Sequence, residues 1–250
     1  MEHAFPKITI AGLTFNLTVI GMSIITALIV AIVARAAASR LDQRSPSGLQ
    51  NFFEWVVDFV RGLARDMMDE ETAEKYLPLG LVMITYLFVA NWMGLITNVV
   101  VHTETGSSFF GIKPGDQVSF FMSPTADLSL AMGMSLMVNI YAHAIGLRHP
   151  KAYFGHYVQP YALMLPMTII EEVSKILTLG LRLFGNIFAG EVLIAVCLQI
   201  PKLFGVLPTG VIPLFPWLAY SGFVSSIQAF VFTVLTFVYI SSKANLAHHH

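Results

Sequence analysis

Residues 167–199 have the sequence MTIIEEVSKILTLGLRLFGNIFAGEVLIAVCLQ, a proline-free and mostly apolar stretch of 33 residues. As one α-helix it would be about 50 Å long, well beyond the ~30 Å of hydrocarbon in a bilayer, so we expect it to tilt strongly or bend. Arg182 lies in its middle, between Leu181 and Leu183. A guanidinium keeps its charge, and at membrane depth that costs at least ~2.5 to 3.5 kcal/mol. We therefore expect this charge to have a function.

The composition indicates a membrane protein. Of 250 residues 56% are hydrophobic and 12% are charged, against roughly a quarter charged in soluble domains. The net charge of -1 argues against a nucleic-acid partner, because no basic surface is available to neutralise phosphates. The single cysteine, Cys197, excludes an intramolecular disulfide and lies in an apolar run, so redox chemistry is not expected.

Apolar segments predict an all-α polytopic membrane protein with one membrane domain over residues 1–250. Five segments are long enough to cross a bilayer, at about 13–34, 77–101, 128–147, 167–199 and 215–240. The last two would form a long, tilted helical hairpin. The first is interpreted as a retained span rather than a signal peptide, because Arg35 and Arg40 follow it and no Ala-x-Ala cleavage site is present.

The distribution of lysine and arginine predicts the orientation, because cytoplasmic segments retain positive charge. With the N-terminus outside, the inner segments would hold Arg35, Arg40, Arg44, Arg61, Arg65, Lys75, Arg148, Lys151 and Lys243. The outer segments would hold Lys7, Lys113 and Lys202. Nine inner residues against three outer ones favour an outside N-terminus and a cytoplasmic C-terminus.

Residues 47–69 predict an amphipathic helix that lies in the membrane interface rather than crossing it. Apolar residues recur there at helical spacing, and polar residues occupy the other face. Ser47 with Gln50 three residues later is a plausible capping start. The alternative is a helix packed against another protein's soluble domain. The Gly-, Ser- and Pro-rich loop at 102–124 is expected to lack regular structure.

Polar residues form a stripe along residues 167–199. At spacings of four, three, four and four, it consists of Glu171, Lys175, Thr178, Arg182 and Asn186. This spacing places them on one helix face. Glu191 follows Arg182 by nine residues, about 180° around the helix, so we expect it on another face. Small residues near Arg182 would let a second helix approach closely: Gly180, Gly185, Ala189 and Gly190.

The final span carries a matching stripe at spacings near 3.6 residues. Its members are Ser221, Ser225, Gln228, Phe232, Thr236 and Tyr239. If the two last spans run antiparallel, Arg182 and Gln228 fall at mid-membrane. The outer half then holds Glu191 and Ser221, and the inner half holds Glu171, Glu172 and Lys175. The sequence therefore predicts two offset polar half-pathways with a fixed cation between them.

Several of these motifs resemble a known family. They are LRLFGN at 181–186 with AGE at 189–191, QAF at 228–230 with VLT at 234–236 and Tyr239, PTAD at 124–127, and NWMGL at 91–95. Together they resemble subunit a of bacterial F-type ATP synthases, over essentially the whole chain. The family implies five transmembrane helices plus an amphipathic one.

The resemblance implies a non-catalytic stator subunit of a rotary proton channel in the cell's inner (plasma) membrane. Its partners would be membrane lipid, an oligomeric ring of c subunits, the peripheral-stalk b subunits and the remaining F0F1 complex, which holds the ATP chemistry. Arg182 would match the family's essential arginine, which attracts ring carboxylates and stops protons leaking between the half-channels. Glu191 would relay protons, and Asn186 and Gln228 would line the site. Ser221 stands where some members have histidine, and a hydroxyl positions water but does not titrate near neutrality.

Plainer interpretations stay open for each residue. Arg182 could pair with a carboxylate of its own chain, and Glu191 could extend to the outer interface. Asn186 and Gln228 could be ordinary interhelical hydrogen-bonding groups. Asp127 could cap its helix or line the outer entrance. The group Glu171, Glu172 and Lys175 could be an interfacial charge cluster or the proton exit, and we expect His143 to be structural rather than a relay.

No metal, phosphate or haem-binding motif is present in the sequence, so no cofactor is predicted. His248–His250 are interpreted as a purification-tag remnant or a disordered end rather than as metal ligands. Two other classes of protein remain as alternatives: a self-contained proton-coupled transporter, and an intramembrane enzyme or haem subunit. We favour H⁺ over Na⁺ as the transported ion because no additional cluster of oxygen ligands is evident.

Overall fold

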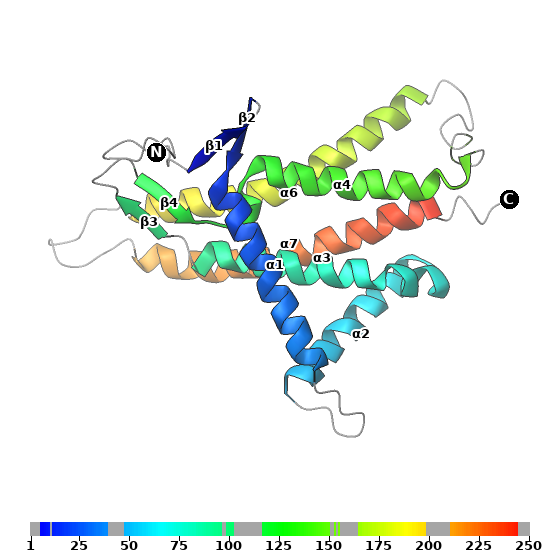
Figure 1. Ribbon diagram of the computed structural model, residues 1–250, viewed down its shortest axis with the longest axis horizontal. Coiled ribbons are helices and arrows are strands. Elements are labelled where there is room, and N and C mark those ends of the chain that lie inside the picture. Colours follow the sequence, from blue (N-terminus) through cyan, green and yellow to red (C-terminus); the bar gives the residue numbers. More distant parts are fainter. Residues whose placement is uncertain are drawn as a thin grey trace. The chain divides into compact units, whose positions relative to one another are not determined.

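The computed structural model describes residues 6–10, 12–39, 48–96, 99–102, 117–150, 153, 155, 165–198 and 211–244. These residues contain six α-helices (Figure 1): α1 Leu17–Ala38, α2 Leu49–Met67, α3 Glu70–Ile96, α4 Leu128–Gly146, α6 Leu165–Leu198 and α7 Val211–Ala244. All but α2 are long and apolar enough to cross a membrane. The predicted all-α polytopic membrane fold is confirmed. The last two spans were located to within about four residues at either end.

The first span begins later than predicted, because the chain before it forms a β-hairpin. Strand β1 (Lys7–Ile10) pairs antiparallel with β2 (Leu13–Asn16), and Gly12 supplies a positive φ of 82° in the turn. The Asn16 side chain then accepts a 3.1 Å hydrogen bond from the Thr18 amide, as an N-cap does. Residues 13–16 therefore belong to a strand, and the prediction that they start the helix was wrong.

The second span also has different ends from those predicted. Asp69 accepts a 3.0 Å hydrogen bond from the Thr72 amide, so α3 begins at Glu70 rather than near residue 77. Beyond the helix, β3 (Val99–His102) pairs antiparallel with β4 (Gln117–Phe121). The β-branched run at 99–101 favours a strand over a helix end. The prediction of a helix to residue 101 and of a loop without structure at 102–124 was wrong at these two strands.

The chain forms two compact units. Unit 1 comprises Met1–Val30, Tyr86–Leu130 and Leu183–Gln228, and unit 2 comprises Ala31–Thr85, Ala131–Arg182 and Ala229–His250. Helices α1, α3, α6 and α7 each contribute residues to both units. Each unit is described by itself below.

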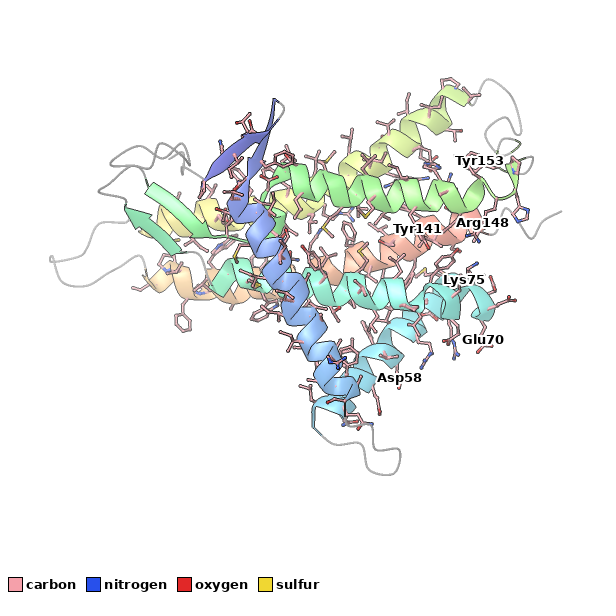
Figure 2. The ribbon with its side chains drawn as sticks, in the orientation of Figure 1. Asp58, Glu70, Lys75, Tyr141, Arg148 and Tyr153 are labelled. Carbon is pink, nitrogen blue, oxygen red and sulfur yellow. The ribbon has the colours of Figure 1, made fainter. Side chains whose placement is uncertain are left out.

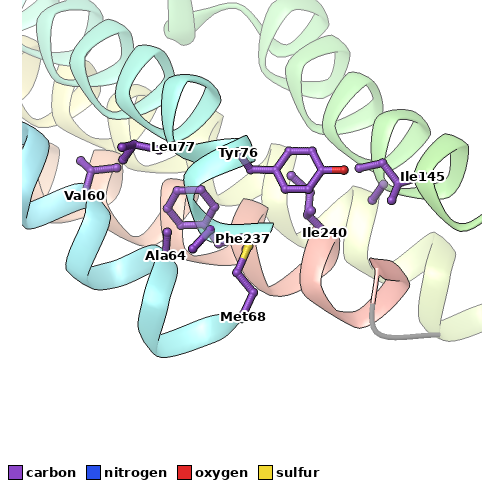
Figure 3. Close-up of a cluster of buried hydrophobic side chains, with 10 residues drawn as sticks. Val60, Ala64, Met68, Tyr76, Leu77, Ile145, Phe237 and Ile240 are labelled. Carbon is purple, nitrogen blue, oxygen red and sulfur yellow. The ribbon is translucent and has the colours of Figure 1, made fainter. Parts of the chain in front are cut away.

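Unit 2 has a hydrophobic core built from α2, α3, α4 and α7 (Figure 3). Its labelled members are Val60, Ala64, Met68, Tyr76, Leu77, Ile145, Phe237 and Ile240. Gly80 of α3 faces the Phe237 ring so closely that a Cβ there would overlap it. Tyr141 of α4 (Figure 2) packs edge-on against Tyr76, with ring centroids 6.2 Å apart. These contacts hold the end of α4 against the start of α3.

The amphipathic character of α2 is visible in which of its side chains are buried and which are exposed. Val60 and Ala64 are fully buried in the unit 2 core, whereas Phe52, Trp55 and Phe59 are exposed and stack in series. On the polar side, arginines and carboxylates form exposed ion pairs: Arg61 with Asp58 and Glu74, and Arg65 with Glu70 and Glu74. An interfacial position suits the exposed aromatic row and stays a prediction. Ser47 lies outside the described residues, so the capping pair with Gln50 stays a prediction too.

Candidate functional site

Arg182 lies on α6, in the last turn that belongs to unit 2, and its side chain is exposed. None of the carboxylates in the described part of the chain forms an ion pair with it. The alternative of a structural cation paired within its own chain therefore gains no support. Of the stripe residues that precede it, Glu171 and Thr178 are exposed as well, and Lys175 is half-buried.

The small residues around Arg182 differ in what they face. Gly180 packs on α4, where an added Cβ would overlap the Met132 side chain and lie 3.2 Å from its Cα. This contact confirms the expected close helix approach and assigns it to a helix of the same chain. In unit 1, Gly185 has no described atom within 4 Å of an added Cβ, and Phe188 and Ala189 are exposed. The described residues of the chain therefore leave this face of α6 uncovered.

Glu191 points into a small cavity in unit 1. The cavity has a volume of about 20 Å³, enough for about one water molecule. Its polar lining comes from α3, α6 and α7 and consists of Asn91, Asn186, Glu191, Ser221 and Ser225. Glu191 thus faces protein rather than extending to an interface. The cavity brings together two predicted polar residues of α6, Asn186 and Glu191, with Ser221 and Ser225 of the α7 stripe. Gln228 is not among its lining residues.

Three buried polar atoms in unit 1 have no hydrogen-bond partner among the described residues: Glu191 Oε1, Ser221 Oγ and Gln228 Nε2. Buried polar groups are nearly always hydrogen-bonded, so each such atom needs a physical explanation. Two of the three belong to residues that line the cavity. Their chemistry suits water: a carboxylate oxygen accepts, and a hydroxyl both donates and accepts.

A buried hydrogen-bond network, which the sequence did not reveal, supports the cavity wall. Asn91 Nδ2 donates to the Ser225 carbonyl at 3.2 Å, and Thr125 Oγ1 donates to Asn91 Oδ1 at 2.9 Å. The hydroxyls of Thr125 and Ser123 share a 2.7 Å hydrogen bond, and Ser123 also donates to the Ala90 carbonyl. This network fixes α3, α7 and the segment before α4 around the cavity. Asn91 and Thr125 lie in motifs that resemble the family, but their pairing spans 34 residues.

Asp127 acts as a helix cap. Its Oδ1 accepts hydrogen bonds from the backbone amides of Ser129 at 2.9 Å and Leu130 at 3.1 Å. The carboxylate thereby satisfies two amides of the first turn of α4, where an anion is also favoured by the helix dipole. Of the two interpretations offered by the sequence, the structure shows the cap.

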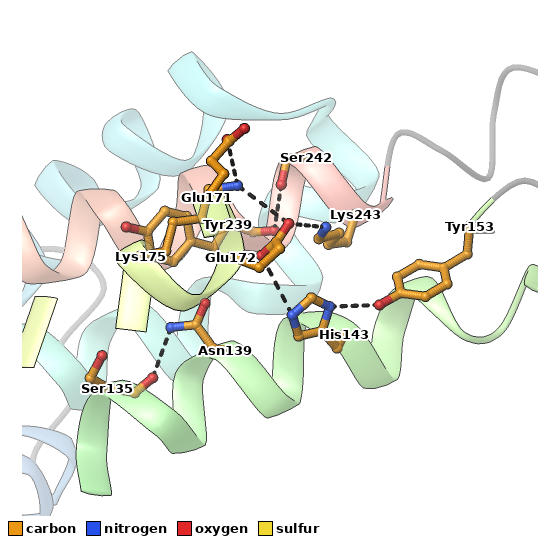
Figure 4. Close-up of polar contacts among 10 residues, drawn as sticks. All are labelled: Ser135, Asn139, His143, Tyr153, Glu171, Glu172, Lys175, Tyr239, Ser242 and Lys243. Atoms are coloured by element: carbon orange, nitrogen blue, oxygen red, sulfur yellow. Dashed lines mark hydrogen bonds and ion pairs between the residues drawn. The ribbon is translucent and has the colours of Figure 1, made fainter. Parts of the chain in front are cut away.

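A second polar cluster lies in unit 2 (Figure 4). Lys243 of α7 donates a 2.6 Å hydrogen bond to Glu172 Oε1, and their side chains are only 5% and 13% exposed. Lys175 lies 3.4 Å from the same oxygen and 3.0 Å from Glu171. The structure therefore brings the predicted group of Glu171, Glu172 and Lys175 together and adds Lys243, whose position at the end of the last span had indicated only a basic flank.

His143 and Tyr239 complete this second cluster. His143 Nε2 lies 3.5 Å from Glu172 Oε2, and its Nδ1 shares a 2.8 Å hydrogen bond with the Tyr153 hydroxyl. The Tyr239 ring lies beneath Lys175, with 5.9 Å from Nζ to the ring centroid. The described residues contain no group of three side chains suited to bind a metal ion. The chemistry available in both clusters is hydrogen bonding and proton exchange.

Comparison with known proteins gives a consistent result. The family model for the ATP synthase A chain matches residues 20–241. Proteins named "ATP synthase subunit a" are similar over the full length: 40% identity over 257 residues in Anoxybacillus flavithermus and 40% over 255 residues in Listeria monocytogenes, each covering 99% of this chain and all of the relative. In Bacillus velezensis the identity is 39% over 261 residues, with both chains fully covered.

Proposed function

Since this chain belongs to the ATP synthase subunit a family, whose members are membrane components of the F0F1 complex, we propose that it forms the stator side of two offset proton half-channels separated by Arg182. The observation that carries the proposal is the environment of the Arg182 side chain. It is an exposed cation on a membrane-spanning helix and has no carboxylate partner among the described residues. A charge so placed is best explained by a partner outside the chain.

The partner that fits is a membrane-embedded carboxylate on a rotating ring of c subunits. At about 4 Å and an effective dielectric of 20, the attraction to Arg182 would be ~4 kcal/mol, strong enough to keep a carboxylate ionised yet weak enough to yield to protonation. The uncovered part of α6 at Gly185 and Ala189 would let a ring helix pass close to the backbone. Each ring carboxylate would lose its proton on one side of the arginine and gain one on the other.

The cavity in unit 1 supports the first half-channel. Glu191 would exchange protons there with water held by Ser221, Ser225 and Asn186, because its buried oxygen and the Ser221 hydroxyl have no hydrogen-bond partner among the described residues. Gln228 would orient the ring-facing end of this path. With Ser221 in place of a titratable side chain, Glu191 and water carry the relay.

The cluster of Glu171, Glu172, Lys175 and Tyr239 in unit 2 would line the second half-channel. From the lysine and arginine distribution we propose that this end faces the cytoplasm and the N-terminus lies outside, in the inner membrane of the cell. Peripheral-stalk b subunits and lipid would hold the stator against the ring's rotation. We propose H⁺ as the ion, and protection of the ring carboxylate by Na⁺ would argue for sodium instead.

ATP-driven proton pumping into vesicles that contain the assembled complex tests this function. Arg182→Ala should abolish pumping while the ring still copurifies. Arg35→Ala is the matched control, because Arg35 is also an exposed arginine on a membrane-spanning helix. Normal pumping by Arg182→Ala would mean that its charge is structural and that the stator mechanism is wrong.

A further inference from the structure

We propose that His143 carries protons between the second polar cluster, formed by Glu171, Glu172, Lys175 and Lys243, and the membrane surface. Glu172 would be its positioning residue, and Tyr153 would lie on its exit side. This inference rests on the proposed function and assigns a relay residue to its second half-channel. It differs from the structural role that the sequence alone favoured for this histidine.

The geometry places a different partner on each ring nitrogen. Nε2 lies 3.5 Å from Glu172 Oε2, and Nδ1 shares a 2.8 Å hydrogen bond with the Tyr153 hydroxyl. The other oxygen of Glu172 is engaged by Lys243 at 2.6 Å, which fixes the carboxylate with Oε2 toward the imidazole (Figure 4). A side chain with two nitrogens facing two partners is the arrangement that lets a proton enter on one side and leave on the other.

Position along the helices gives the path a direction. His143 lies in the last turn of α4, Glu172 in the second turn of α6, and Lys243 next to the final residue of α7. These ends meet in unit 2, and Tyr153 lies seven residues beyond the end of α4. The His143 side chain is 26% exposed, whereas that of Lys243 is 5% exposed. Lys175, the third basic group that contacts Glu172, is 25% exposed, so the imidazole is more accessible than Lys243 and about as accessible as Lys175.

The charges around His143 both stabilise a proton on its ring and oppose its retention. From α6, Glu171, Glu172 and Lys175 face this cluster, and α7 contributes Lys243 and Tyr239. With both glutamates ionised and both lysines protonated, these groups sum to zero, so a proton on His143 is the excess charge. Glu172 stabilises that charge locally, as a carboxylate does beside a histidine that accepts a proton, while Lys243 and Lys175 oppose its permanent retention.

The transfer conserves protons and breaks no bond between heavy atoms. A proton arriving along the half-channel binds Nε2, and the resulting imidazolium is held by Glu172. The proton on Nδ1 then leaves on the Tyr153 side to surface water. A flip of the neutral ring then turns its remaining N–H from the Glu172 side to the Tyr153 side, so that an unprotonated nitrogen again faces Glu172 and no proton returns to the half-channel. The opposite sequence serves flow in the other direction.

The test is the passive proton conductance of vesicles that hold the complex after its ATP-hydrolysing part has been stripped. His143→Gln can still donate and accept hydrogen bonds but cannot carry a proton, so conductance should fall about tenfold or more. Millimolar imidazole should restore conductance to His143→Ala. Tyr153→Phe, which keeps the ring and removes the hydroxyl, should show a smaller decrease. His149→Gln is the control, because His149 is exposed and just past the same helix.

The outcomes separate this inference from the proposed function. If His143→Gln conducts like His149→Gln while Arg182→Ala still abolishes pumping, the relay is wrong and the stator mechanism stands. If His143→Gln and His143→Ala lose conductance but imidazole restores nothing in the assembled complex, the histidine is structural and the inference is overturned. Rescue by imidazole would support it, because a packing defect does not depend on an added proton carrier.

Discussion

Lys243 and Glu172, which are 71 residues apart in sequence, form a buried ion pair with Nζ and Oε1 2.6 Å apart, and this pair ties the end of α7 to the start of α6. Removing one member of a buried pair leaves an uncompensated charge, which typically costs ~3 to 5 kcal/mol. In Lys243→Met, Lys175 still lies 3.4 Å from Glu172 Oε1, so the free energy of unfolding should fall by this amount at most. Arg61→Met, which breaks exposed pairs, should cost ~1 kcal/mol or less.

Denaturant titration of both variants in detergent measures this difference in the free energy of unfolding. The double variant Lys243→Met/Glu172→Leu should recover part of the loss, because it removes both charges together. Equal destabilisation by Lys243→Met and Arg61→Met would show that the Lys243 pair is not buried as described.

The Glu191 carboxylate is expected to be needed for proton transfer rather than for folding. Its Oε1 is buried without a hydrogen bond to any described residue, so Glu191→Gln, which has the same shape, should assemble normally. ATP-driven pumping should fall by ~100-fold or more, because the amide cannot exchange a proton. Pumping is measured by quenching of a pH-sensitive dye in vesicles, and Glu71→Gln, at an exposed position, is the control. Full activity in Glu191→Gln would remove this residue from the relay.

Asn91 and Thr125 should show strong energetic coupling. One buried hydrogen bond joins the two side chains, and loss of either residue leaves the other unsatisfied at a cost of ~1 to 3 kcal/mol. Asn91→Leu and Thr125→Val should each destabilise the protein, and the double variant should cost less than the sum. A double-mutant cycle on unfolding free energies tests this. Strict additivity would contradict the network that supports the cavity wall.

Gly180 and Gly185 offer a matched pair on one helix. Gly180→Ala introduces a Cβ that overlaps Met132, so it should destabilise the chain by ~1 to 3 kcal/mol. Gly185→Ala meets no described atom within 4 Å and should leave the isolated chain as stable as before. If a ring helix passes over this part of α6, Gly185→Ala should weaken copurification of the ring.

Thermal unfolding of the isolated chain and ring yield after purification of the complex separate these two effects. The result that would contradict the assignment of faces is the reverse pattern, with Gly185→Ala unstable in isolation and Gly180→Ala impaired only in assembly.

The sequence predicts the helices well and the strands poorly. Membrane spans depend on long apolar runs, so α4, α6 and α7 were placed nearly at their observed ends. Residues 13–16 adjoin the apolar run of α1, and 99–101 are three valines after α3. Only pairing with β1 and β4 makes these segments strands, which is a property of the tertiary structure. Local capping by Asn16 and Asp69 then sets where α1 and α3 begin.

The candidate site, too, could be predicted from the sequence only in part. Helical spacing placed Arg182 and Glu191 on different faces, and Arg182 is exposed whereas Glu191 points into a cavity of its unit. Asn186, predicted on the face of Arg182, lines the same cavity as Glu191. The partners of Glu172 could not be found from spacing, because Lys243 and His143 come from other helices and their contacts depend on how the ends of α4, α6 and α7 meet. The same holds for the hydrogen bonds of Asn91 with Thr125 and Ser225.

The central claim is that the charge of Arg182 keeps two proton pathways apart while it exchanges ring carboxylates. Passive proton flux through the stripped complex in vesicles, with and without an imposed membrane potential, tests it most directly. Arg182→Ala should lose ATP-driven pumping yet still conduct protons passively, since water then joins the two pathways. Absence of passive flux in stripped Arg182→Ala vesicles, or ATP-driven pumping that persists in the intact Arg182→Ala complex with its ring, would contradict the account.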